Sequence, residues 1–198
     1  INGLISFGSE VKLLQPLTPM SSEFIKQLET IRPRGNTHLW DAINEAKDQI
    51  VKLTSVDEEE EEEEMGDSPF PNAHLRIIVI SDGSDNISTK DKIELANELI
   101  ENNIIVDTVL VCLDELNNDC CALSKITGGL CFKTESLEDG LKLFEQEAFL
   151  NLSLRHFTSP ILNEKKVTLE QFTKLSTNFK DFDTFAENQE IINANGDI

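Results

Sequence analysis

Residues 77–88, IIVISDGSDNIS, carry the strongest strand signal in this 198-residue chain. Four apolar residues run into Ser81-Asp82-Gly83, and a polar stretch then leads toward a helix. A short apolar run that ends in turn residues is typical of a strand buried on both faces of a parallel sheet. Because open α/β sheets bind ligands beyond the carboxyl ends of their strands, Asp82 is a candidate ligand-binding residue.

The loop at residues 82–86 alternates oxygen-bearing side chains, which superficially resembles a cation-binding loop. An EF-hand loop needs glycine at its sixth position and glutamate at its twelfth. Counted from Asp82, those positions hold Ile87 and Ile93, so the loop is not a calcium site by itself. We expect Ser84-Asp85-Asn86 to be turn residues rather than ligands.

Strand and helix patterns alternate along most of the chain. A Gly-containing turn at residues 8–10 joins the first two expected strands as an antiparallel hairpin. Later strands and helices alternate, which implies right-handed crossovers and a parallel sheet. We predict an α/β fold with a doubly wound, mainly parallel sheet, an antiparallel edge strand and three α/β/α layers. Strands are expected at residues 4–7, 11–14, 77–80, 104–113 and 130–133, and helices at 21–31, 37–51, 90–102, 116–126 and 137–149, with Thr37 capping the second helix.

The chain divides into a domain at residues 1–150 and a C-terminal extension at residues 151–198. Residues 54–73 interrupt the domain with seven consecutive glutamates, and we expect this insertion to be disordered. An acidic docking tract for a basic partner is the alternative. Phenylalanines at helix-like spacing in residues 168–185 fit either a helix that packs back on the domain or the start of a further module.

Composition limits the classes of partner. The net charge of −20 and the pI near 4.4 argue against nucleic acid and against an anionic membrane surface. No apolar run is long enough to span a membrane, and no signal peptide opens the chain. The four cysteines form no C-x-x-C pair, so we expect free thiols and a cytoplasmic location, with Cys112 and Cys131 in the core.

Templates for enzymes find no match. The sequence contains no dinucleotide-binding G-x-G-x-x-G, no P-loop and no G-x-S-x-G elbow. A catalytic cysteine needs a nearby histidine, and no pattern places one there. From the sequence, we expect no enzymatic activity.

Four stretches in order make the chain resemble a von Willebrand factor type A domain over roughly residues 1–148. The expected hairpin resembles the family's second strand and its antiparallel edge strand. The stretch after it resembles the loop and helix that carry the family's metal-site threonine, and the strand ending in Asp82-Gly83 resembles its fourth strand. The stretches read GLISFGSEVKLLQPLT, IRPRGNTHLWDAINEAKDQI, RIIVISDGSDN and LSKITGGLCFK.

This resemblance implies a protein-interaction module with a metal-ion-dependent adhesion site. In the family, three loops hold a divalent cation, which then accepts a Glu or Asp of a protein partner. Thr37 matches the family's threonine and Asp82 matches its aspartate, and oxygen ligands of this kind suit Mg²⁺ or Mn²⁺. The family's D-x-S-x-S motif is absent, so we expect its first strand and helix to precede Ile1 and this chain alone to bind the cation weakly or not at all.

A second reading needs no metal. Asp82 would then cap its loop by hydrogen bonds, and the acidic tract or the Phe-rich C-terminal segment would bind a protein partner. Under both readings the partner is a protein rather than nucleic acid or a membrane.

Overall fold

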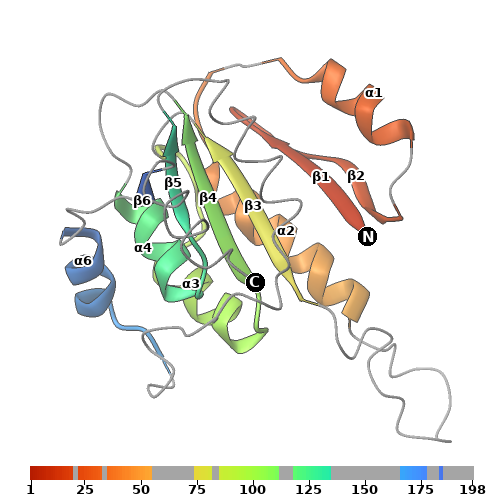
Figure 1. Ribbon diagram of the computed structural model, residues 1–198. Helices are drawn as coiled ribbons and strands as arrows, with labels where there is room; N and C mark the ends of the chain where they lie inside the picture. The colour runs from red at the N-terminus through yellow and green to blue at the C-terminus, as the bar shows by residue number, and fades with distance from the viewer. Residues whose placement is uncertain are drawn as a thin grey trace, which may run out of the picture. The chain divides into compact units, whose positions relative to one another are not determined.

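The computed structural model describes residues 1–19, 22–32, 35–54, 74–81, 85–111, 118–134, 166–177 and 183–184. These residues form a mixed α/β structure with an antiparallel two-stranded sheet and a parallel sheet (Figure 1). The chain divides into two compact units. The first comprises Ile1–Leu75 and Asp85–Leu95, and the second comprises Arg76–Ser84 and Ala96–Ile198. Among the described residues, no helix combines the length and the apolar character that a membrane span needs.

The first unit contains the predicted hairpin. Strand β1 (Asn2–Phe7) pairs antiparallel with β2 (Val11–Thr18), and the pairing of Phe7 with Val11 places a short turn at residues 8–10. Helix α1 (Ser22–Thr30) follows, and α2 (Leu39–Thr54) packs against both strands of the hairpin. One face of α2 is buried, including the only tryptophan of the chain, Trp40. The structure therefore confirms the predicted hairpin and the two predicted helices that follow it.

The second unit is built on the parallel sheet. Strands β3 (Arg76–Ser81), β4 (Ile105–Val111) and β5 (Cys131–Thr134) lie side by side in that order, and the two-residue strand β6 (Asp183–Thr184) extends the sheet beyond β5. Helix α3 (Lys92–Glu101) connects β3 to β4, and α4 (Asn118–Ile126) connects β4 to β5. These parallel β-α-β connections are those the alternating sequence pattern predicted.

One feature of β3 differs from the prediction. Ile77 and Val79 are buried, but Ile78 and Ile80 are 45% and 52% exposed. The strand is therefore buried on one face, and the expectation of burial on both faces is wrong. Among the described residues, β3 is the end strand of the parallel sheet. Continuous burial is instead found in β4, where Val106 through Leu110 are at most 3% exposed.

Two polar residues inside β4 are explained by their contacts. Asp107, 1% exposed, forms an ion pair with Arg76 of β3 and accepts a hydrogen bond from the backbone amide of Leu130 at 2.7 Å. The hydroxyl of Thr108 lies 2.8 Å from that of Ser124 in α4. These contacts satisfy buried polar groups and connect β4 to β3, to α4 and to the residue before β5.

A disulfide next to the turn between α4 and β5 shows that the prediction of free cysteines is wrong for two of them. Cys121 of α4 and Cys131 of β5 form a disulfide, with their Cα atoms 5.1 Å apart. The sequence suggested free thiols because no spacing motif pairs these two cysteines. In the structure, the tight turn at residues 127–130 returns the chain antiparallel to α4 and brings the two cysteines together. Cys120 is buried and lies outside the disulfide, and Cys112 lies outside the described residues.

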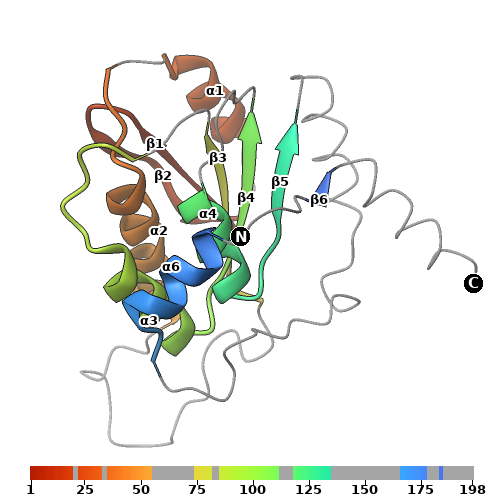
Figure 2. The same ribbon diagram turned by 90° about the vertical axis from the view of Figure 1, so that its left-hand side faces the viewer.

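The C-terminal segment packs back on the second unit. Helix α6 (Leu169–Thr177) lies against α4 (Figure 2), and Phe172 is completely buried. The Asn97 side chain of α3 accepts from the amide of Val167 at 2.6 Å and donates to the carbonyl of the same residue at 3.2 Å. This supports the packed-helix alternative for residues 169–177, although the helix ends before Phe185. The predicted helix at residues 137–149 and the acidic insertion at 55–73 lie outside the described residues, and the domain boundary at residue 150 stays a prediction.

Candidate functional site

The loop that carries Thr37 is attached to the turn of the hairpin. Gly35 adopts a φ of 65°, and a Cβ at this position would lie 1.9 Å from the hydroxyl oxygen of Ser9. Only glycine combines this backbone conformation with so close an approach. The amide of Asn36 then donates to the Ser9 hydroxyl at 3.1 Å, and the amide of His38 donates to the carbonyl of Gly8 at 3.1 Å.

Asn86 holds the other side of this loop. The amide of Thr37 donates to the Asn86 side-chain oxygen at 2.9 Å, and the amide of Asn86 donates to the carbonyl of Thr37 at 3.2 Å. Both polar groups of the Thr37 backbone are therefore occupied. Its side-chain hydroxyl, by contrast, forms no hydrogen bond within the described part of the chain.

The N-terminus of α2 is capped by residues far away in the sequence (the α2 cap). The amide of Leu39 donates to Asp85 at 2.8 Å, and the amides of Trp40 and Asp41 donate to the Ser88 hydroxyl at 3.0 and 3.2 Å. Ser88 in turn donates to Asp85. The prediction that Thr37 caps this helix is therefore wrong, because the side chains of residues 85–88 supply the missing acceptors.

Asp41, in the first turn of α2, also connects this helix to the segment after Ser88, this time through its own side chain. Its carboxylate accepts from the amides of Thr89 and Lys90 at 2.9–3.1 Å and contacts the His38 ring nitrogen Nδ1 at 2.9 Å. Burial disfavours the charged form, but the backbone hydrogen bonds from Lys90 and Thr89 and the side-chain hydrogen bonds from His38 and Thr89 outweigh it. The pKa of Asp41 therefore lies below its ordinary value of 3.8.

These contacts separate structural carboxylates from candidate ligands. Asp85 and Asn86 accept hydrogen bonds from the backbone around the start of α2, as side chains in turns commonly do. The Thr37 hydroxyl, on the loop held by Ser9 and Asn86, has no hydrogen-bond partner within the described residues. Asp82, the other predicted ligand, lies outside the described residues, so the structure does not test whether the two lie together. Within the described ranges, no cluster of three or more His, Cys, Asp or Glu side chains is placed to hold a metal.

The sequence analysis missed Asp41 and Ser88, on which the α2 cap depends. Each is an ordinary residue at its position in the chain, and 47 residues separate them. A weak signal exists, because an Asp-x-x-Ser stretch at residues 85–88 offers two side-chain acceptors beside a turn. Nothing in the sequence indicates which helix these acceptors serve.

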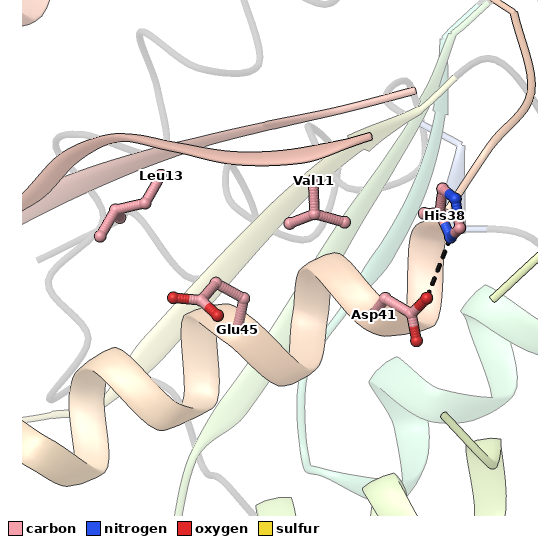
Figure 3. Close-up of a pocket in the computed structure, with 5 residues that line it drawn as sticks. All are labelled: Val11, Leu13, His38, Asp41 and Glu45. Carbon is pink, nitrogen blue, oxygen red and sulfur yellow. Dashed lines mark hydrogen bonds and ion pairs between the residues drawn. The ribbon is translucent and has the colours of Figure 1, made fainter. Parts of the chain in front are cut away.

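A pocket opens between the hairpin and α2 in the first unit (the α2 pocket). Its volume is about 500 Å³, and Figure 3 shows Val11 and Leu13 on the strand side of it and Asp41 and Glu45 on the helix side. His38 lies at the end of the pocket next to Asp41. Hairpin residues and helix residues therefore supply an apolar wall and an acidic wall, respectively.

Comparison with known proteins gives one distant relative in sequence. No protein-family model matches the chain. A probable bifunctional E2/E3 enzyme of Acanthamoeba polyphaga mimivirus is 22% identical over 167 residues, which is 83% of this chain. The chain spans only 12% of the length of that relative. The relative is named as an enzyme, and this contradicts the expectation, drawn from absent motifs, that no enzymatic activity is involved.

Two solved structures are similar in part. An uncharacterised membrane-spanning protein from Vibrio fischeri matches with a TM-score of 0.37 and 17% identity, over 75% of each chain. Proximal thread matrix protein 1 from the mussel byssus matches with a TM-score of 0.48 and 16% identity, over 73% of this chain and 33% of its own.

Proposed function

We propose that this chain is a protein-binding module of the von Willebrand factor A type that forms part of a larger E2/E3-type enzyme. In this proposal the module binds a protein partner for the enzyme, through a divalent cation held by Thr37 and Asp82. The finer architecture that the family implies, a doubly wound sheet in three layers, belongs to the same proposal. The enzymatic part rests on the name of the viral relative alone, since the chain spans 12% of that protein.

The observation that carries the metal-binding proposal is the state of Thr37. Its loop is attached to the hairpin turn through Gly8 and Ser9 and to Asn86 on the other side. Its hydroxyl has no hydrogen-bond partner within the described residues, although the residue is only partly exposed. A neutral oxygen held on a rigid loop and free of other contacts suits a cation ligand.

The residues fit Mg²⁺ or Mn²⁺ in chemistry as well as in position along the chain. Thr37 would contribute a neutral hydroxyl and Asp82 a carboxylate, and both are hard oxygen donors. A cation bound with few charged ligands supplies an electrophilic position for a carboxylate of a partner protein. The α2 cap keeps the Asp85 carboxylate occupied, which leaves Thr37 and Asp82 as the matching ligands.

Mn²⁺ titration followed by NMR tests this proposal directly. Paramagnetic broadening should centre on the amides near Thr37 and Asn86, at Mn²⁺ concentrations high enough for weak binding. Thr37→Val removes the hydroxyl and preserves the shape of the side chain, and Asp82→Asn removes the charge. Each substitution should abolish the broadening at Thr37.

Thr89→Val is a matched control for the threonine substitution. It removes a hydroxyl that bonds to Asp41 at 3.2 Å but keeps both proposed ligands, so the broadening near Thr37 should remain. Broadening that centres on the glutamates at residues 58–64, and that Thr37→Val leaves unchanged, would contradict the proposed site.

A further inference from the structure

We infer that the α2 pocket binds a Lys or Arg side chain of a protein partner. This site needs no metal and is independent of the proposed cation site at Thr37. Its volume, about 500 Å³, lies within the range of roughly 300–1,000 Å³ that is usual for ligand pockets. Among the described residues, those that line the pocket all belong to one unit of the structure.

The two carboxylates that face this pocket accept hydrogen bonds. One carboxylate oxygen of Glu45 accepts from Gln49 at 2.9 Å, and the other has no partner within the described residues. The His38 atom Nδ1 lies 2.9 Å from a carboxylate oxygen of Asp41 at the end of the pocket.

Asp41 adds negative charge to the pocket without being available for direct bonding. Its oxygens already accept from Thr89, Lys90 and His38. The nearby Lys90 ammonium is engaged by Glu94 at 3.2 Å, one turn into the next helix. A ligand that donates hydrogen bonds and carries positive charge therefore matches the available Glu45 oxygen and the negative charge of Asp41, and an anionic ligand does not.

The apolar wall selects the shape of that ligand. Val11 and Leu13 lie on the strand side, and Leu13 is 40% exposed although it is a leucine. Lysine and arginine have an aliphatic stem that packs on apolar surface and a charged end that reaches a carboxylate. The stem would cover Leu13 and the charged end would reach Glu45, as the two walls in Figure 3 are arranged. The net charge of −20 also favours the approach of a basic partner.

Amino-acid probes separate charge from shape. The probes are N-acetyl-lysine methylamide, N-acetyl-arginine methylamide and N-acetyl-norleucine methylamide, and the readout is the methyl NMR signals of Val11 and Leu13 during titration. The two cationic probes should shift these signals, and norleucine, which has the stem without the charge, should not. Glu45→Gln should weaken binding of the cationic probes about fivefold, as expected for loss of a partly exposed charged hydrogen bond.

Two further variants complete the test. Asp48→Asn removes a carboxylate of the same helix that lies outside the pocket and pairs with Lys47, so it controls for net charge and should leave binding unchanged. Leu13→Lys places a cation at the pocket from the chain itself and should abolish probe binding, with folding checked by Trp40 fluorescence. Equal shifts with norleucine, or equal losses in Glu45→Gln and Asp48→Asn, would overturn the inference. Absence of Mn²⁺ broadening near Thr37 would contradict the cation site but would not affect the inference about the α2 pocket.

Discussion

The α2 cap predicts a large effect from the loss of one hydroxyl group. The Ser88 hydroxyl accepts from the amides of Trp40 and Asp41 and donates to Asp85, so Ser88→Ala removes three hydrogen bonds. Loss of an N-cap side chain costs about 0.5–2 kcal/mol. Because two amides lose their acceptor and Trp40 is only 6% exposed, we expect a loss near the upper end, about 2 kcal/mol.

Two measurements check this value. A loss of about 2 kcal/mol corresponds to a fall in Tm of roughly 4–8 °C for a chain of this size. Trp40 is the only tryptophan, so its fluorescence follows unfolding at the capped end of α2 itself. Hydrogen exchange should show faster exchange of the Trp40 and Asp41 amides, while amides in the middle of α2 change less.

Ser88→Thr is the matched control, since it keeps the hydroxyl and should retain most of the stability. The reasoning fails if Ser88→Ala melts at the same temperature as the wild type and leaves exchange of the Trp40 amide unchanged. In that case water replaces the Ser88 hydroxyl without loss, and the cap is not a source of stability.

Three more predictions concern the two units separately. Asp107→Ala should destabilise the protein by about 3–5 kcal/mol in urea unfolding, because it breaks a buried ion pair by removing the carboxylate that faces Arg76. Gly129→Ala should lower Tm strongly and Ser substitution should do no better, because any Cβ would lie 2.0 Å from the carbonyl oxygen of Val106, a backbone atom that has little freedom to move. The pKa of Asp41 is lowered in the folded state, so the stability that its carboxylate contributes should be complete above about pH 4 and lost as the pH falls toward the folded-state pKa. Urea titration at several pH values measures this acid dependence. In Asp41→Asn, this part of the dependence should be absent.

Periodicity in the sequence was enough to predict most helices and strands of the described residues. The hairpin, α2, β4 and the β-α-β connections follow from apolar spacing and turn residues, which are local signals. Exposure of Ile78 and Ile80 could not be predicted in the same way, because an apolar run has the same composition whether both faces are covered or only one. Which neighbours cover a strand is decided by tertiary packing.

The candidate site likewise contains features that the sequence could predict and features that it could not. Thr37 and Asp82 were found by resemblance of short motifs, and their role as cation ligands stays a prediction, since Asp82 lies outside the described residues. The disulfide and the α2 cap join residues that have no motif in common, so only the folded chain reveals them. The α2 pocket is of the same kind, since Leu13 and Glu45 come from different elements.

The α2 cap also has a consequence for how the chain closes on itself. Ser88 holds the start of α2 through the amides of Trp40 and Asp41, so the contact joins residues far apart in the chain. The entropy of closing a loop grows only with the logarithm of its length, so doubling that separation would cost only about 0.6 kcal/mol. The length of chain between the two partners therefore matters less to the stability of the cap than the hydroxyl group at residue 88 that closes it.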